Sequence, residues 1–240
     1  MKARYASEVN VMIGKLKKHI KKHFNLEFND EKLLIEAFTH SSYANDHRKR
    51  NLKNLERLEF LGDAVVELCT SEYLYNKFPE LPEGQLTRMR AASVREESLA
   101  QLALECHLAQ FVRLGKGEEM MNGRTRPALL CDVFEAFIGA IFQDQGLEVA
   151  REFLSNVLFP KIDNDDFSHG MDFKTSLQEL VQQNGEVHIT YEVIDTTGPD
   201  HEREFTVEVT VEGDSYGIGK GNSKKRAEQQ AAKKALEQLS

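Results

Sequence analysis

Four acidic residues recur at helical spacing in residues 54–67, and carboxylates in this pattern could bind a metal ion. At about 100° per residue, Glu56, Glu59, Asp63 and Glu67 lie within roughly 80° of each other on one side of a helix. Like charges three or four positions apart repel, so the stripe costs stability. Local rules of this kind are broken mostly at functional sites.

The rest of this helix is expected to position the acids. The apolar side predicts a core face made of Leu58, Leu61, Val65 and Leu68. Gly62 borders the acidic stripe and costs about 1 kcal/mol inside a helix. We expect it to permit the close approach of another backbone.

A second helical stretch, residues 131–142, carries Asp132 and Glu135 as neighbours on one face. Ala136 and Gly139 flank these acids, and the broad apolar face consists of Phe134, Phe137, Ile138 and Ile141. If the two acidic stripes face each other, Glu59, Asp63, Asp132 and Glu135 converge. Such a cluster requires cations, and hard oxygen ligands suit Mg²⁺ or Mn²⁺. Either stretch alone is more often a solvated face, but two of them, each with an internal glycine, favour a metal site.

At these residues the chain resembles a known family. Residues 56–65 (ERLEFLGDAV) are similar to the signature of ribonuclease III, the double-stranded-RNA endonuclease, and residues 132–140 resemble its second acidic motif. Residues 39–43 and 114–118 match further family segments, and the resemblance covers nearly the whole chain. Leu55 departs from the pattern, because the family usually has a polar residue there.

The resemblance implies roles for individual residues. The metal-binding carboxylates would be Glu59, Asp63, Asp132 and Glu135, with Asp63 and Glu135 catalytic. Glu56 and Glu83 match positions that contact RNA near the scissile bond, and Phe60 matches the aromatic residue that inserts into the partner subunit of a homodimer. Mg²⁺ is the expected cofactor, with Mn²⁺ able to substitute.

Composition restricts the class of protein. The 240 residues carry a net charge of −8, which argues against a simple non-specific nucleic-acid binder, so any RNA binding must come from local patches. Three cysteines (Cys69, Cys106 and Cys131) fit no zinc spacing and are expected to be small buried residues in a reducing cytosol. There is no apolar run of about 18 residues and no signal-peptide pattern. We therefore expect a cytoplasmic protein without membrane contact.

Periodicity divides the chain into two domains joined by a linker. Residues 1–160 show helical spacing and no convincing alternating strand, which predicts an all-α endonuclease domain. Its basic helix at residues 1–24 is expected to be a solvated face over a core stripe, not a membrane-surface helix. Residues 161–171 are polar and read as a linker. Residues 172–240 predict an α-β-β-β-α order, in which Gly217 and Gly219 interrupt the third strand.

The final helix carries the strongest RNA signal. Lys224, Lys225 and Arg226 crowd its first turn after a natural N-cap at Asn222 or Ser223, although the helix dipole favours acids there. A bound phosphate would relieve this conflict; the alternative is that these are tolerated surface lysines.

Residues 221–232 resemble the end of a double-stranded-RNA-binding domain. By this resemblance Lys224 and Lys225 contact phosphate, and the loop holding Pro199 and His201 enters a minor groove. Thr175, Gln178 and Glu179 match first-helix positions that meet 2′-hydroxyls. This mode recognises duplex shape more than sequence.

Three weaker signals are set aside or left open. Residues 114–117 (LGKG) lack the spacing and ending of a phosphate-binding loop. His40 is more easily explained as a hydrogen-bonded structural histidine than as a metal ligand. The basic run Arg48–Arg50 is equally compatible with phosphate contact and with a solvated charge run.

Together these features predict metal-dependent hydrolysis of double-stranded RNA. The resemblance implies that the 3′ oxygen leaves, that products carry 5′-phosphates, and that rRNA and mRNA precursors are processed. A symmetric homodimer matches the dyad relating two antiparallel strands. The alternatives are an RNA-binding module with a vestigial nuclease domain, and a different Mg²⁺-dependent all-α hydrolase acting on nucleotides.

Overall fold

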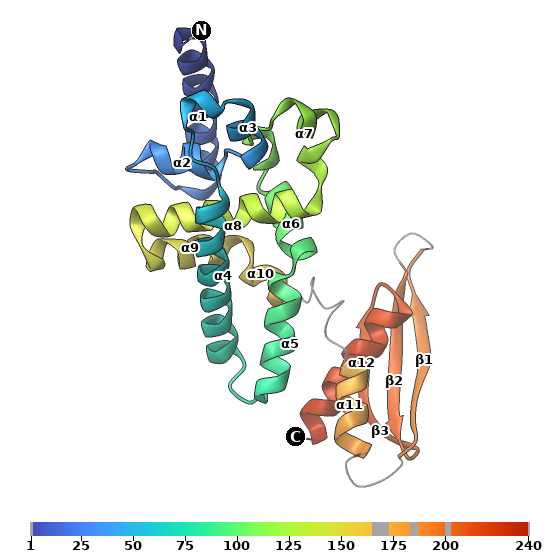
Figure 1. Cartoon of the computed structure of the whole chain (residues 1–240). Helices are drawn as coiled ribbons and strands as arrows, with labels where there is room; N and C mark the ends of the chain where they lie inside the picture. Colours follow the sequence, from blue (N-terminus) through green and yellow to red (C-terminus); the bar gives the residue numbers. More distant parts are fainter. Residues whose placement is uncertain (1, 165–172, 183–186, 200–202, 240) are drawn as a thin grey trace. The chain divides into compact units, whose positions relative to one another are not determined.

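The computed structural model describes residues 2–164, 173–182, 187–199 and 203–239, with residues 2–10 described by their backbone alone. The chain forms two compact units, residues 1–170 and 171–240. The first unit is helical (Figure 1), and its elements are α1 (Lys2–Phe24), α2 (Glu31–Ala37), α3 (Ser41–Asp46), η1 (Arg48–Arg50), α4 (Glu56–Lys77), α5 (Glu83–Val94), α6 (Glu96–Glu105), η2 (Ala109–Phe111), α7 (Lys116–Met120), η3 (Gly123–Thr125), α8 (Pro127–Gln145), α9 (Leu147–Val157) and α10 (Phe159–Asp163).

Helix α8 is the centre of the first unit. Its apolar residues are almost all buried, including Phe134, Phe137 and Ile138 at 0% exposure. It packs against α2, α4, α6 and α9, and α4 passes across it (Figure 1). Pro127 at its first position starts the helix without losing a hydrogen bond. A helix that is apolar on nearly every side is stable only when other helices surround it.

Helices α4 and α8 touch through their backbones at two glycines. A Cβ atom at Gly62 would lie 1.8 Å from the carbonyl oxygen of Glu135, and one at Gly139 would lie 2.1 Å from that of Leu58. No side chain larger than hydrogen fits at either position. The close backbone approach predicted for Gly62 is therefore confirmed.

The buried face of α4 differs from the prediction. Leu58 and Val65 are buried as expected and Leu61 is half-buried, but Leu68 is 53% exposed. The buried face instead includes Gly62, Val66 and Cys69, because α8 packs directly against Gly62 and draws that side of the helix inward.

Helix α10 also differs from the prediction, since it extends three residues into the segment 161–171 that polarity assigned to a linker. Phe159 and Ile162 are buried and hold this turn against the unit. Residues 165–172, which include the remainder of that segment, lie outside the described residues.

The second unit packs two helices on one face of an antiparallel sheet. Its elements are α11 (Phe173–Val181), β1 (Ile189–Thr197), β2 (Glu204–Val211), β3 (Asp214–Gly221) and α12 (Lys224–Leu239), with sheet order β1-β2-β3. The predicted α-β-β-β-α order is confirmed. The core is formed by Phe173, Leu177, Val207, Val209 and the alanines of α12.

Residues 214–221 form a single strand β3, contrary to the interruption expected at its glycines, although its pairing with β2 shifts register at Tyr216, beside Gly217. Gly217 pairs with Val209 and Gly219 with Val207, so both glycines lie on the face that packs against α12. A Cβ atom at Gly219 would lie 2.1 Å from the backbone nitrogen of Ala231. The glycines therefore permit close packing of strand and helix, and they do not end the strand.

The glycine contact in the first unit yields a stability prediction. Gly62→Ala places a methyl group against an immobile backbone carbonyl and should lower the free energy of unfolding by about 3 kcal/mol or more, measured by urea unfolding. Gly14→Ala on α1 is the matched control, because a Cβ atom added there would have no atom within 4 Å outside its own stretch of helix. That control should be neutral or stabilising by up to about 1 kcal/mol. Equal stabilities for the two variants would contradict the backbone contact between α4 and α8 at Gly62.

Candidate metal centre

Three carboxylates from two distant segments meet beside the glycine contact. Glu59 lies in the first turn of α4, and Asp132 and Glu135 lie one turn apart on α8. Each offers one oxygen, and these three oxygens lie within 4.8 Å of one another. Because Gly62 touches the backbone of Glu135, the same contact that joins the helices brings these acids together.

Asp63 borders this cluster. It is exposed and follows Glu59 by one helical turn, and it is not part of the set of three whose oxygens converge. Its negative charge nevertheless contributes to the raised pKa of Glu135 and of Glu59.

Burial opposes ionisation of all three acids, and repulsion within the acidic cluster adds to this effect at Glu135 and Glu59. Burial, followed by the charge of Asp63, raises the pKa of Glu135 to about 8. Burial and then the charge of Asp132 raise the pKa of Glu59. Burial also raises the pKa of Asp132, while the nearby His40 and Arg126 lower it. Partly buried carboxylates crowded in this way are a common feature of functional sites.

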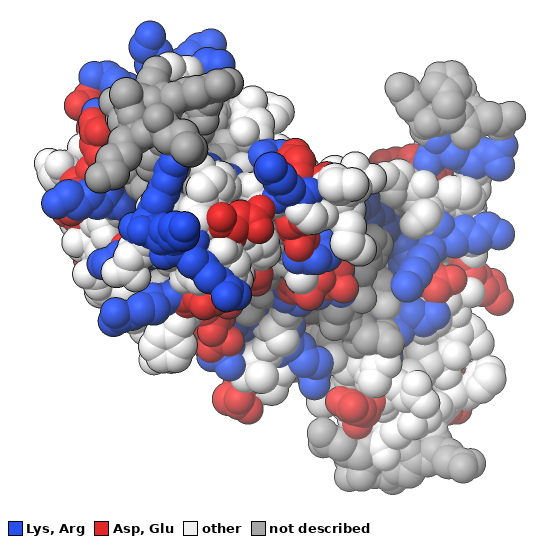
Figure 2. Space-filling view, turned by 45° about the horizontal axis from the view of Figure 1, so that its top comes forward, with Lys and Arg blue, Asp and Glu red and all other residues white. Residues whose placement is uncertain are grey.

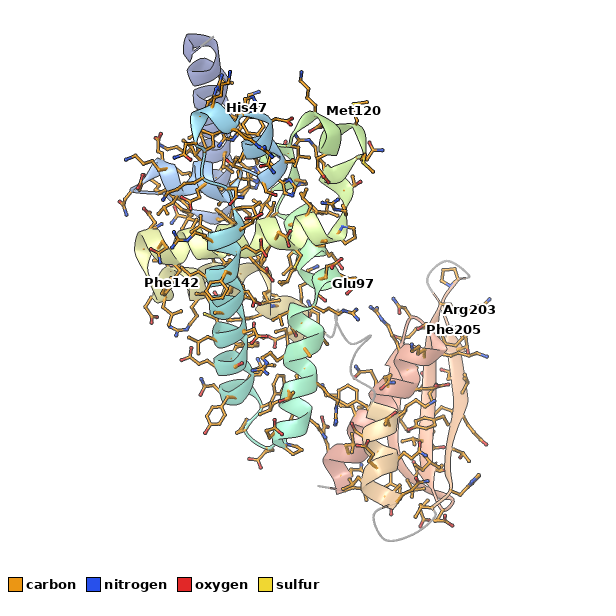
Figure 3. The ribbon with its side chains drawn as sticks, viewed as in Figure 1. His47, Glu97, Met120, Phe142, Arg203 and Phe205 are labelled. Carbon is orange, nitrogen blue, oxygen red and sulfur yellow. The ribbon has the colours of Figure 1, made fainter. Side chains whose placement is uncertain are left out.

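One side of the cluster is built from the segments 39–43 and 114–118. The Nδ1 atom of His40 accepts a hydrogen bond from the backbone N–H of Ser42 at 3.3 Å, so His40 caps α3, and the backbone N–H of Gly115 donates to Ser42 Oγ at 2.9 Å. Arg126 forms an ion pair with Glu118 at 2.8 Å. Helices α3 and α7 contact each other, and Figure 3 labels His47 and Met120 near them.

Cys131 is a neighbour of the cluster that sequence reasoning did not identify. Its thiol lies 3.5 Å from Glu135 Oε1 and donates a hydrogen bond to it. Cys131 is buried, as its apolar neighbours in the sequence predict. Its position four residues before Glu135 on a helix was the available signal.

The donor set fits a hard divalent cation. It consists of carboxylate oxygens, which Mg²⁺ and Mn²⁺ prefer. Oxygens that share one Mg²⁺ lie up to about 4.2 Å apart, so small side-chain movements would allow the three acids to bind a common ion. Such an ion would also offset the repulsion that raises their pKa values.

The remaining predicted residues of the first unit lie along α4 and α5. Glu56 is exposed in the first turn of α4, where the helix dipole favours an acid. Phe60 is 82% exposed. Glu83 opens α5 and lines a cavity of about 360 Å³ between α4 and α5, together with Leu68 and Tyr75.

In the second unit, the predicted RNA contacts of α11 lie on its outer side. Thr175, Gln178 and Glu179 are exposed, while Phe173 and Leu177 on the opposite side of the helix are buried. Pro199 is also exposed, and His201 lies outside the described residues.

Helix α12 begins with a capping residue followed by basic side chains, as the sequence predicts. Ser223 is the N-cap, because its Oγ accepts from the backbone N–H of Arg226 at 3.2 Å. Lys224 and Lys225 follow, both exposed, at the positive end of the helix dipole. Acidic and basic side chains are otherwise mixed on the surface shown in Figure 2.

Comparison with known proteins decides the family. Residues 30–162 match the model described as Ribonuclease-III-like, and residues 173–239 match the double-stranded RNA binding motif. The chain belongs to the ribonuclease III family. Like other members, it is a double-stranded-RNA endoribonuclease, and the family uses divalent metal ions.

Several relatives are similar over almost their full length. The chain is 55% identical to Ribonuclease 3 of Enterococcus faecalis over 228 residues, which are 95% of this chain and 99% of that protein. It is 55% identical to Ribonuclease 3 of Geobacillus thermodenitrificans over 220 residues, 92% and 89% of the two chains. The crystallised nuclease domain of ribonuclease III from Campylobacter jejuni is 38% identical, with a TM-score of 0.55 over 60% of this chain and 93% of that one. Among the described residues, no helix combines the length and apolar character needed to cross a bilayer.

The raised pKa of Glu135 predicts how stability depends on pH in the presence of a chelator. A carboxyl with a pKa of about 8 in the folded state and an ordinary value of 4.5 binds its proton more tightly when folded. Its contribution to stability is therefore complete below about pH 4.5 and is lost as the pH rises through about 8. Glu135→Gln removes this loss, so the melting temperature of the variant should exceed that of the unaltered protein increasingly from pH 5 to pH 8. Parallel melting profiles would contradict this assignment.

Proposed function

We propose that Glu59, Asp63, Asp132 and Glu135 bind Mg²⁺ and form the catalytic centre for hydrolysis of duplex RNA, with Asp63 and Glu135 catalytic and Mn²⁺ able to substitute. The observation that carries this proposal is the convergence of the Glu59, Asp132 and Glu135 oxygens within 4.8 Å. When bound, the cation would supply activation of water and stabilisation of the charge that develops on the phosphate.

The protein residues have separate tasks in this proposal. Glu59 and Asp132, on different helices, hold the cation in place. Glu135, with its pKa raised to about 8, is mostly protonated near neutral pH without a cation, and it would lose this proton on binding one. Asp63 supplies a further, exposed carboxylate toward solvent, where the RNA must approach. Water adds to the phosphorus as the bond from phosphorus to the 3′ oxygen breaks, and a proton released by that water ends on the leaving oxygen, so that the products carry 5′-phosphates and 3′-hydroxyls.

We further propose that RNA binding is divided between the units. Glu56 and Glu83 contact RNA near the scissile bond in the nuclease domain, which extends to the end of α10 at residue 163. After the linker that follows α10, the domain of residues 172–240 binds the duplex backbone, and the contacts assigned to it are Thr175, Gln178, Glu179, Pro199, His201, Lys224 and Lys225. Processing of rRNA and mRNA precursors in the cytoplasm belongs to the same proposal.

A homodimer through α4 completes the proposal. Phe60, Leu68 and Tyr75 are 82%, 53% and 73% exposed, and they fall within about 80° on one side of the helix. Exposed apolar residues aligned in this way favour a protein interface. A dimer also supplies two centres related by a dyad, as the two strands of a duplex are. The description of one Campylobacter jejuni nuclease-domain structure, 39% identical to this chain, names a region involved in dimer formation in that protein.

Replacing one carboxylate tests the catalytic centre. Glu135→Gln should reduce cleavage of long duplex RNA in Mg²⁺ by about a thousandfold or more, which corresponds to about 4 kcal/mol of barrier, while duplex binding in gel-shift assays changes little. Glu67→Gln, an exposed acid on the same side of α4, is the control and should retain activity. Reactions with EDTA, single-stranded RNA and duplex DNA should give no products.

Three outcomes would contradict the proposal. Duplex binding without EDTA-sensitive cleavage in the unaltered protein would indicate a binding module with a vestigial nuclease domain. Cleavage that survives Glu135→Gln would refute the assignment of this centre. Turnover of free nucleotides, unaffected by removal of residues 172–240, would indicate a small-substrate hydrolase.

Truncating the exposed aromatic residue tests the dimer. Phe60→Ala should raise the dimer dissociation constant at least about tenfold in sedimentation experiments, because exposed aromatic side chains often dominate an interface. Met120→Ala is the matched control, since Met120 is 84% exposed but lies on α7. An unaltered protein that is monomeric at concentrations where it cuts both strands would refute the dimer.

A further inference from the structure

Three histidines gather away from the carboxylate cluster, where the end of α1 meets the turn after α6. His19 and His23 are one helical turn apart on α1, and His107 follows α6 with a φ of 53°. The two α1 residues precede the part of the chain that matches the family model, which begins at residue 30. None of the three takes part in the function proposed above.

The spacing of the rings suits shared binding of a metal ion. The ring centroid of His19 lies 4.6 Å from that of His23 and 6.1 Å from that of His107. Two imidazoles on one tetrahedral Zn²⁺, with metal–nitrogen bonds of about 2.0–2.1 Å, have ring centroids about 5 Å apart. The two observed spacings lie on either side of this value.

A hydrogen bond to the backbone fixes the tautomer of His19. Its Nε2 atom lies 2.9 Å from the carbonyl oxygen of Cys106, and a carbonyl can only accept, so Nε2 carries a proton and donates. In the neutral ring this leaves the lone pair on Nδ1. Metal-binding histidines usually donate their second nitrogen to a backbone carbonyl or carboxylate in this way, which fixes the ring and its tautomer.

The other two rings can complete the site by rotation. His23 and His107 are exposed, whereas His19 is half-buried and packs against Phe111, with ring centroids 5.3 Å apart. The three sets of ring nitrogens do not converge in the present rotamers, since among the described residues only the carboxylates do so. Binding therefore needs side-chain rotation at two exposed positions around a fixed third ligand.

We propose that His19, His23 and His107 bind a divalent transition-metal ion such as Zn²⁺ or Ni²⁺, and that the ion ties α1 to the turn after α6. Imidazole nitrogen suits these ions, whereas Mg²⁺ prefers the carboxylate oxygens of the other cluster. The two sites therefore select different cations. Because α1 contacts the unit mainly through α2 and η2, such a clamp would restrain its C-terminal half.

Calorimetric titration of the full chain with Ni²⁺, in the presence of excess Mg²⁺, tests this site. The variant combining His23→Ala with His107→Asn should bind Ni²⁺ at the site at least about tenfold more weakly, or lose one equivalent. Asparagine is chosen at position 107 because it tolerates the positive φ. His188→Ala, which removes an exposed histidine of the second unit, is the control and should bind as the unaltered protein does.

A second readout separates this site from the carboxylate cluster. Ni²⁺ should raise the melting temperature of the unaltered protein and of Glu135→Gln, but not that of the double histidine variant. Circular dichroism of the double variant should match that of the unaltered protein. Unchanged stoichiometry and affinity in the double variant would overturn the proposal, as would Ni²⁺ binding that disappears only in Glu135→Gln.

Discussion

The direct backbone contact between α4 and α8 is the constraint on which the nuclease unit depends. Two glycines, Gly62 and Gly139, meet the facing carbonyls at distances that exclude any Cβ atom. Residues 129–141 of helix α8 are buried except for the half-buried Asp132 and Glu135, so this part of the helix cannot move without disrupting the core. Its position relative to α4 is therefore fixed, and with it the separation of Glu59 from Asp132 and Glu135. Packing in the core and geometry in the acidic cluster are consequences of one contact.

This arrangement places an electrostatic cost where a cation can offset it. Because α4 and α8 are held in contact, the three carboxylates remain close together, and burial denies them full hydration. His40 and Arg126 offset part of this cost at Asp132. Glu135 lies beside the Cys131 thiol, and its pKa is raised to about 8. Crowded carboxylates of this kind destabilise the folded state when no cation is bound, and a bound cation would remove this cost. Cation binding and the stability of the fold are therefore coupled.

Glycines also allow a close backbone contact in the second unit, here between a strand and a helix. Gly217 and Gly219 bring β3 close to α12, which fixes the helix over the sheet and presents its first turn to solvent. Lys224 and Lys225 are exposed there, after a capped helix start. A chain with a net charge of −8 can therefore still offer a local anion-binding surface. Local placement of charge, and not its total, determines what such a chain can bind.

The sequence by itself determined which residues share a face: periodicity identified the acidic stripes, the amphipathic helices and the alternating strands, and the motifs indicated the family. Only the tertiary structure decided what covers each face. It exposed Leu68, made β3 continuous, placed the Cys131 thiol against Glu135 and left Asp63 at the border of the cluster. The physical reason is that helical and strand periods describe one element at a time. The partner of each face is set by contacts between segments far apart in the chain, and a single sequence does not record those contacts.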